Sequence, residues 1–155
     1  MSPRAALLAI AVVLLGLAIL TPRGSPSKGP YAADITRTPG VLNPDVAQAN
    51  IDTTICRHGW TRTIRPPTSY TNELKRKQMR EYGVGGALSD YQEDHLISLE
   101  LGGHPTDPRN LWPEPYPRAS EVDSIENELN AKVCSRQMSL EQAQLRESEL
   151  KHKNG

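Results

Sequence analysis

The sequence predicts a small α+β domain with more helix than strand, and three patterns support that prediction. The stretch "DHLISLELGGHPTDPRNLW", residues 94–112, combines an alternating apolar run, a double glycine and a second short apolar run, which is typical of a strand–turn–strand unit. Helix formers fill residues 71–82, and apolar residues recur at helical spacing in residues 120–135. A chain of 155 residues is long enough for one such domain.

The N-terminus has the layout of an export signal. Arg4 precedes the uninterrupted apolar run from Ala5 to Leu20. As a helix this run would be about 24 Å long at roughly 1.5 Å per residue, which is short for a bilayer core of about 30 Å. A basic residue before a run of that length is typical of secretory signals. We therefore expect residues 1–21 to be a signal peptide or an N-terminal membrane anchor. The protein would then be periplasmic, secreted or associated with the inner membrane through residues 5–20.

Composition divides the remaining chain into a linker and a folded domain. Residues 22–40 are rich in Pro, Gly and Ser, which predicts a linker, and the folded domain is expected over residues 41–150. Near its start, an asparagine followed by proline at Asn43-Pro44 predicts the beginning of a short helix. The alternation in "GWTRTIR", residues 59–65, predicts a strand that the following two prolines end.

Capping signals set the expected bounds of the later elements. Gly83 follows the helix predicted over 71–82 as a natural C-cap, and Gly102-Gly103 turn the chain after a strand over 94–101. A second strand is expected at "NLW". The next helix opens at Ser120 with a capping box and runs to about Ser135. Its apolar stripe comprises Val122, Ile125, Leu129 and Val133. A last helix begins near Ser139, and the tail "KHKNG" is expected to fray.

The two cysteines, Cys56 and Cys134, are far apart and show no CxxC spacing or partner His cluster, which argues against a zinc site. In an oxidising compartment they most simply form one disulfide. If the chain stays in the cytosol, two buried free thiols are the better interpretation.

Charge is unevenly distributed although the formal net charge is zero. Basic residues predominate in residues 57–80, and acidic residues predominate in residues 81–127. A basic face beside an acidic cluster suits a phosphodiester held near a divalent cation, although charged faces are often simply solvated. Arg76, Lys77 and Arg80 should lie on the exposed side of their helix and contact nucleic-acid backbone.

The strand–turn–strand unit carries the residues most suited to catalysis. His95 can activate water as a general base, because the pKa of histidine lies near neutrality. Asn110, across the hairpin, can accept a hydrogen bond from the N–H of the other imidazole nitrogen through its side-chain carbonyl. Asp94 points to the other face of the strand and can reach a metal ion. Asn127 is the first choice to complete the metal site from the following helix, before Asn130, Asp123 or Glu126.

This arrangement resembles the HNH (His-Me finger, ββα-metal) endonucleases. The resemblance rests on Asp94-His95, on Asn110 and on a following helix that carries "DSIEN". The sequence "DHLISLELGG…NLWPEP" resembles the sequences of a small bacterial group of exported or membrane-anchored HNH-like proteins. The similarity extends upstream through "TPGVLNPDV" and downstream past Cys134. It implies a domain built around a ββα-metal hairpin and helix. His95 would be the general base, Asn110 the orienting residue and Asp94 a metal ligand.

The sequence departs from that family at the third motif position, which is usually a histidine. Only Asn127 and Asn130 are available there, and amides hold metals more weakly than imidazole or carboxylate groups. The resemblance nevertheless implies a divalent ion, magnesium first and manganese, nickel or zinc as alternatives.

The function implied is an exported nuclease with little sequence preference that acts on DNA rather than RNA and has no obvious protein partner. Arg109, on the hairpin loop, is a candidate phosphate clamp. One alternative is a non-catalytic cell-envelope module that keeps the HNH scaffold to bind nucleic acid or a protein. A toxin-like effector nuclease is another, although no delivery domain is visible.

Overall fold

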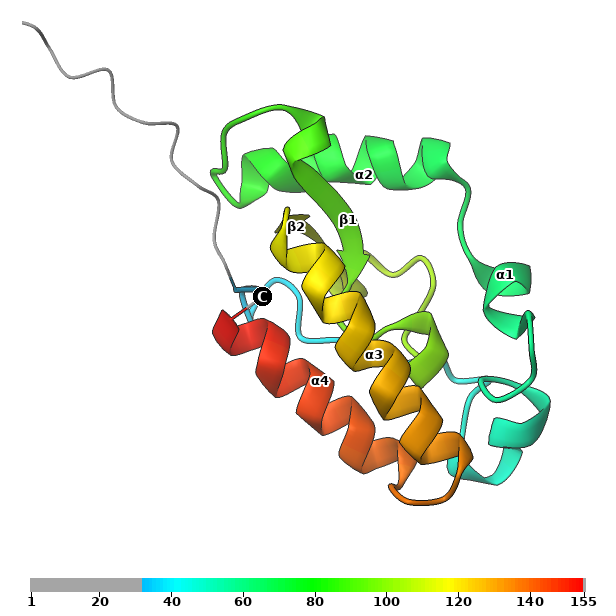
Figure 1. Ribbon diagram of the computed structural model, residues 1–155. Helices are drawn as coiled ribbons and strands as arrows, with labels where there is room; N and C mark the ends of the chain where they lie inside the picture. Colours follow the sequence, from blue (N-terminus) through cyan, green and yellow to red (C-terminus); the bar gives the residue numbers. More distant parts are fainter. Residues whose placement is uncertain (1–31, 155) are drawn as a thin grey trace, which may run out of the picture.

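The computed structural model describes residues 32–154 (Figure 1). The predicted export signal and residues 22–31 of the predicted linker therefore lie outside the described residues. Within the described part of the chain, no helix has both the length and the apolar character needed to cross a lipid bilayer.

A two-stranded antiparallel sheet lies among the helices. Strands β1 (Tyr91–His95) and β2 (Leu111–Pro115) pair so that His95 is opposite Leu111. Helix α2 (Thr68–Glu81) packs against both strands, and α3 (Arg118–Cys134) packs against β2 and α4 (Leu140–Asn154) (Figure 1). Shorter pieces are α1 (Trp60–Ile64) and the 3₁₀ turns η1 (Gln48–Thr53), η2 (Leu88–Asp90), η3 (Leu99–Leu101) and η4 (Pro108–Asn110). The predicted mixed α and β domain is confirmed at this level.

The helix predictions succeed where periodicity is long. The helix predicted from residue 71 begins at Thr68, and α3 covers the predicted range but starts at Arg118. The strand predicted over residues 59–65 is wrong, because that segment forms α1. Gly59 has a left-handed φ of 78° and accepts a hydrogen bond from the Arg62 amide, which starts a helical turn. The short helix expected after Asn43 is the 3₁₀ turn η1, which begins only at Gln48.

Strand β1 overlaps the strand predicted over residues 94–101 only at Asp94 and His95. It begins earlier, at Tyr91, and ends at His95, because the chain then folds tightly over the double glycine. The amide of Gly103 donates to the carbonyl of Ser98. A Cβ atom at Gly103 would lie 1.7 Å from the Ile97 carbonyl oxygen, so no other residue fits there. Residues 99–101 consequently turn as η3 instead of continuing the strand.

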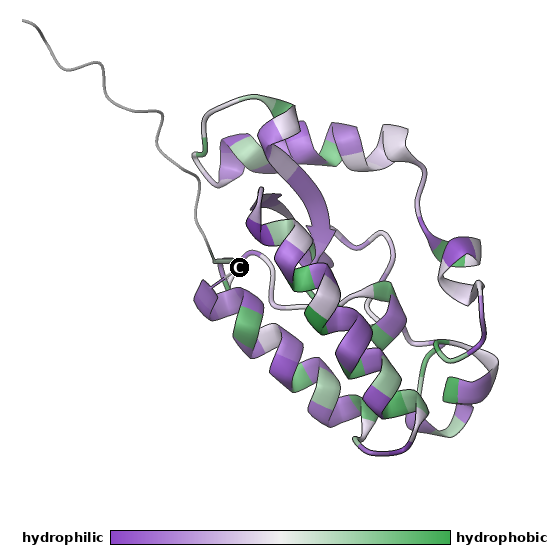
Figure 2. Cartoon of the chain, in the orientation of Figure 1, coloured by the Kyte–Doolittle hydropathy of each residue, from purple (hydrophilic) through white to green (hydrophobic). Residues whose placement is uncertain are grey.

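The main core lies between α3, α4, η1 and η3. Its fully packed members are Ile51, Ile55, Ile97, Leu101, Leu129, Val133, Leu140 and Ala143. Apolar positions are interspersed with polar ones along α3 and α4 (Figure 2). The predicted stripe on α3 is confirmed for Val122, Leu129 and Val133, which are buried, and Ile125 packs against the core while partly exposed.

Two predicted boundaries have to move. Residues 33–40 belong to the folded domain and not to the linker, because Ala33 is buried with Leu96 and Trp112, and its amide donates to the Lys151 carbonyl at 2.9 Å. The predicted fraying of the tail is also wrong, since α4 continues to Asn154 and Lys151 is fully buried. The two ends of the described chain thus pack on each other.

The predicted disulfide is confirmed, with a bond of 2.02 Å between Cys56 and Cys134. It ties the segment before α1 to the last residue of α3 across a sequence separation of 78 residues.

Removing this cross-link should destabilise the domain substantially. For the double variant Cys56→Ser/Cys134→Ser we expect a loss of about 2–4 kcal/mol in unfolding free energy, because the unfolded chain regains the freedom that the long loop had lost. Urea unfolding with and without reductant measures it. Reduced wild-type protein should match the double variant, and equal midpoints for oxidised and reduced wild type would contradict the prediction.

Candidate functional site

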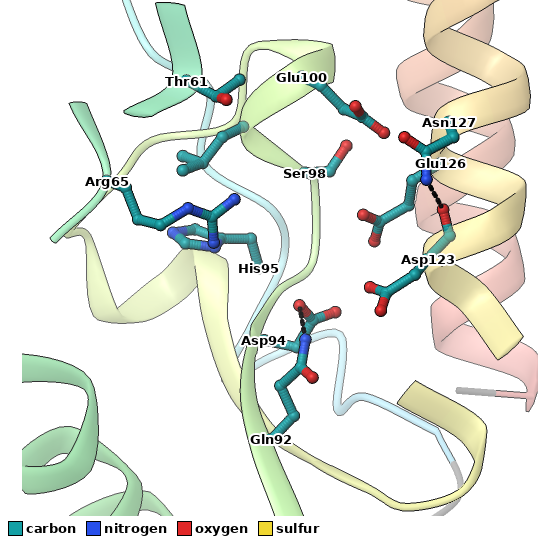
Figure 3. Close-up of a pocket in the computed structure, with 11 residues that line it drawn as sticks. Thr61, Arg65, Gln92, Asp94, His95, Ser98, Glu100, Asp123, Glu126 and Asn127 are labelled. Carbon is teal, nitrogen blue, oxygen red and sulfur yellow. Dashed lines mark hydrogen bonds between the residues drawn. The ribbon is translucent and has the colours of Figure 1, made fainter. Parts of the chain in front are cut away.

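A polar cavity of about 240 Å³ opens between β1, the end of α1, η3 and α3 (Figure 3). It brings together three of the predicted site residues: Asp94, His95 and Asn127. Asp123 and Glu126, weighed as alternative ligands, line the same wall as Asn127 (Figure 3). The predicted meeting of the hairpin with the following helix is therefore present.

His95 is held in one orientation and one tautomer. The residue is 6% exposed, and its Nε2 lies 3.0 Å from the Pro105 carbonyl oxygen. Because a carbonyl can only accept, Nε2 donates, and the neutral ring keeps its lone pair on Nδ1. Burial lowers the pKa of His95, and this effect outweighs the Pro105 hydrogen bond and the Asp94 charge, which raise it. The ring is thus mainly neutral at pH 7, as a general base must be.

Asn110 does not contact the His95 ring in the predicted way. Its side-chain oxygen accepts from the Ile97 amide at 3.0 Å, and its side-chain nitrogen donates to the carbonyls of Ile97 and His104, each at 3.0 Å. The predicted hydrogen bond to imidazole is therefore wrong. Asn110 instead bonds the backbone of Ile97 as a strand partner would, at the point where the ladder ends. The Pro105 carbonyl, on the loop that Asn110 fastens, orients His95.

Loss of the Asn110 side-chain hydrogen bonds should destabilise the domain. In Asn110→Ala, the amide and the carbonyl of Ile97 lose their buried partner, and each unpaired group costs roughly 1–3 kcal/mol. We expect a large fall in melting temperature by circular dichroism, together with loss of any activity that depends on His95. Asn127→Ala, which removes an exposed amide, is the matched control. A melting temperature for Asn110→Ala equal to that control would contradict this role.

Asp94 is paired with a buried lysine. One carboxylate oxygen accepts from the side-chain amide of Gln92 at 3.1 Å (Figure 3), and the other accepts from Lys151 Nζ at 2.7 Å. Burial raises the pKa of Asp94, but the Lys151 charge and the hydrogen bonds of Glu114 and Lys151 outweigh it and hold the pKa well below its usual range. Asp94 is therefore ionised and has a counter-charge within the protein.

Lys151 reaches further groups behind the cavity. Its Nζ lies 2.5 Å from Glu126 Oε1, 2.5 Å from the His95 carbonyl oxygen and 3.5 Å from Glu147 Oε1. Glu147, fully buried, accepts from the Ser98 amide with both oxygens at 3.0 Å. One ammonium thus connects α4 to β1 and α3.

Glu114 completes this buried cluster from β2. Burial and the neighbouring Asp94 charge raise the pKa of Glu114 to about 9, so it is protonated at neutral pH. A protonated Glu114 can donate its O–H to the Asp94 carboxylate. This hydrogen bond satisfies the buried Glu114 side chain, which has no other partner within residues 32–154.

The remaining cavity wall is acidic. Burial raises the pKa of Glu100 to about 7, and the charges of Glu126 and Asp123 add to that effect. Burial and the Asp94 charge also raise the pKa of Asp123. Crowded carboxylates with raised pKa values favour a bound cation. Their oxygen atoms, with the side-chain carbonyl of Asn127, suit magnesium or manganese better than nickel or zinc.

The described residues do not form a closed metal site. Between residues 32 and 154, no three His, Cys, Asp or Glu side chains make a group that could hold an ion by themselves. The donors present fit a hydrated ion held by one or two carboxylates and completed by a ligand phosphate, which is a common mode for magnesium.

Two other predicted site residues lie outside the cavity. Asn130 does not line the cavity. Its side-chain nitrogen donates to the carbonyl oxygens of Glu100 at 2.6 Å and Ile55 at 3.4 Å, which fastens α3 to the chain. Arg109 is not a cavity residue, because its guanidinium is held by both carboxylate oxygens of Asp107 at 3.0 and 2.6 Å.

The predicted basic group is exposed on α2, as expected. Arg76, Lys77 and Arg80 line a separate hollow of about 510 Å³ with Tyr70, Leu74 and other residues. This hollow shares no lining residue with the cavity at His95.

Sequence reasoning missed the contributions of Lys151, Glu147 and Arg65. A signal for the first two exists, because Leu140, Ala143, Glu147 and Lys151 recur at helical spacing and are the buried residues of α4. Two charged residues that continue an apolar face at i, i+4 indicate a buried ion pair. No comparable pattern marks Arg65, which reaches the cavity only through the turn after α1.

Comparison of the whole chain with models of protein families, with curated proteins and with solved structures finds no match. The local geometry of the cavity is therefore the basis for any assignment of function.

Proposed function

We propose that the protein is a metal-dependent nuclease of the HNH type that hydrolyses phosphodiester bonds, with His95 as the general base. One observation carries the proposal. A buried, neutral histidine of fixed tautomer lines a polar cavity whose opposite wall, on α3, presents Asp123, Glu126 and Asn127 (Figure 3). A base facing an acidic metal-binding wall is the arrangement that phosphodiester hydrolysis requires.

Each side chain then has a defined task. His95 Nδ1 takes a proton from the attacking water, and the Pro105 carbonyl keeps the ring in the tautomer that can do so. Asp123, Glu126 and Asn127 would hold the divalent ion from α3, and Asp94 lines the same cavity from β1. When bound, that ion supplies charge neutralisation for the phosphate and the leaving oxygen.

A cleavage assay tests the proposal. Full-length protein purified in oxidised form is incubated with plasmid DNA and with RNA in magnesium, manganese, nickel or zinc. We expect cleavage that requires the metal, is faster on DNA and is lost with a chelator. Absence of cleavage of both substrates in every metal would contradict the proposal. The disulfide supports export, because such bonds persist in oxidising compartments.

A non-catalytic binding module is the second candidate, and the Lys151–Asp94 contact favours it. The expected metal ligand already has a buried cation at 2.7 Å. In that case the protein binds nucleic acid or a cell-envelope protein without cutting, and metal has no effect on binding.

The basic group on α2 should contribute to binding under either candidate. Neutralising Arg76, Lys77 and Arg80 to Gln should weaken DNA binding for all sequences and reduce the slope of log affinity against log salt by about 0.9 for each lost phosphate contact. Fluorescence anisotropy with a labelled duplex measures both. The matched control neutralises Lys132, Arg146 and Lys153 on α3 and α4. An identical slope for the two triple variants would mean that the α2 face is merely solvated.

A further inference from the structure

Arg65 lines the cavity and is exposed there. It is the C-cap residue of α1 and lies beside His95, across from the α3 wall that carries Asp123 and Glu126 (Figure 3). Among residues 32–154, its side chain makes no direct hydrogen bond or ion pair, although its charge acts on Glu100 and Asp123. Arg109, by contrast, is bound by Asp107 and lies elsewhere.

The backbone holds Arg65 in place although its side chain makes no direct hydrogen bond within the described chain. Its amide donates to the Thr61 carbonyl at 3.0 Å, and Pro66 follows it, which restricts it to an extended conformation. The adjoining segment is anchored further back by the Cys56–Cys134 disulfide. A guanidinium presented from a fixed backbone loses less freedom when it binds a ligand.

A ligand that interacts favourably with both Arg65 and the α3 carboxylates has to carry anionic oxygens and bind a cation. A guanidinium offers five donors in a planar fork that matches two phosphate oxygens. The α3 carboxylates repel the same oxygens unless a metal ion lies between them. A phosphate group with a divalent ion on its far side fits this division of charge, whereas an uncharged ligand leaves Arg65 unpaired.

We propose that Arg65 is the phosphate-binding residue of this cavity, where its guanidinium holds the non-bridging oxygens of a phosphodiester between His95 and the acidic wall of α3. This inference rests on the proposed function and names the group that positions its substrate. Arg65 then recognises the phosphate at the reacting centre. Arg109 and the basic group on α2 take no part in that contact.

The first test observes binding without catalysis. Full-length protein labelled with ¹⁵N-arginine is titrated with inorganic phosphate in the presence of magnesium, and the Arg Nε–Hε resonances are followed. The resonance assigned to Arg65, through its absence in Arg65→Lys, should shift saturably. Phosphate affinity should fall at least about tenfold in Arg65→Gln, which is the loss of about 1.4 kcal/mol, and less in Arg65→Lys, which keeps the charge but not the fork.

Arg62→Gln is the matched control, because Arg62 is an exposed residue of α1 that does not line the cavity. It should bind phosphate as wild type does. An Arg65 resonance that does not move, or equal affinities for Arg65→Gln and Arg62→Gln, would overturn the inference. Thermal melts check folding, and the wild-type titration decides the question even if Arg65→Gln fails to fold.

The second test separates this inference from the proposed function. On a DNA substrate, kcat/KM should fall by roughly 10²-fold in Arg65→Gln, a typical loss for one donor to the reacting group, and should not change in Arg62→Gln. Cleavage by Arg65→Gln at the rate of Arg62→Gln overturns the role of Arg65 while the proposed nuclease stands. If wild type cleaves nothing, the nuclease proposal fails, and the phosphate titration still decides whether Arg65 binds phosphate.

Discussion

Cleavage of DNA by His95→Ala should be slower than cleavage by the wild type by about 10²–10⁴-fold, the usual contribution of a general base. The ring is the one group in the cavity whose free nitrogen can take a proton from water near neutral pH while its other nitrogen is held by a carbonyl. Rates on plasmid DNA with magnesium and manganese measure the effect. His58→Ala, which changes an exposed histidine before α1, should behave as wild type.

The pH dependence of the wild-type rate supplies an independent check on the same residue. A general base works only when unprotonated, so the rate falls as the pH drops through the pKa of the base. Because burial lowers the pKa of His95, the acidic limb of the profile should lie below pH 6.5, about the ordinary histidine pKa. His95→Ala should lose that limb. A His95→Ala rate equal to the wild-type rate in every metal would show that His95 is not the general base.

The hairpin, α3 and the disulfide could be predicted from the sequence because their signals are local or have few alternatives. The double glycine marks a tight turn, because a Cβ atom at Gly103 would lie 1.7 Å from the Ile97 carbonyl oxygen. The stripe on α3 has four members over about three turns, and two cysteines allow a single pairing. The pairing of β1 with β2 followed by α3 then brings Asp94, His95 and Asn127 to one cavity.

The errors arise where contacts distant in sequence decide the structure. Alternation over residues 59–65 looks like a strand, but Trp60 and Ile64 are also four residues apart, as on one face of a helix. In the described chain no partner strand pairs with this segment. The role of Asn110 depends on which backbone groups reach it: His95 Nε2 donates to the loop carbonyl of Pro105, while the Asn110 side chain bonds Ile97 and His104. Lys151 is 57 residues from Asp94, so no local pattern connects them.

Lys151→Met should be the most destabilising single substitution. In the wild type, the ammonium is fully buried and contacts Asp94 and Glu126, with Glu147 at 3.5 Å. Methionine has a similar length but no charge, so these buried acids lose their counter-charge. Breaking a buried ion pair by removing one partner costs roughly 3–5 kcal/mol. Urea unfolding at pH 7 measures it, and the exposed Lys153→Met on the same helix should change stability by no more than about 0.5 kcal/mol.

The pH dependence of that loss distinguishes a charge effect from a packing effect. In the wild type, the folded pKa of Asp94 lies below the unfolded value, so the pair stabilises the fold above the unfolded pKa, near pH 4, and this contribution fades as the pH falls through the folded pKa. Without Lys151, burial raises the folded pKa of Asp94 instead, and the penalty grows as the pH rises above about 4. The stability gap between wild type and Lys151→Met should therefore be widest at neutral pH and should narrow as the pH approaches 4. A gap that stays constant between those values would show that Lys151 acts through packing alone, and that the charge on Asp94 does not depend on it.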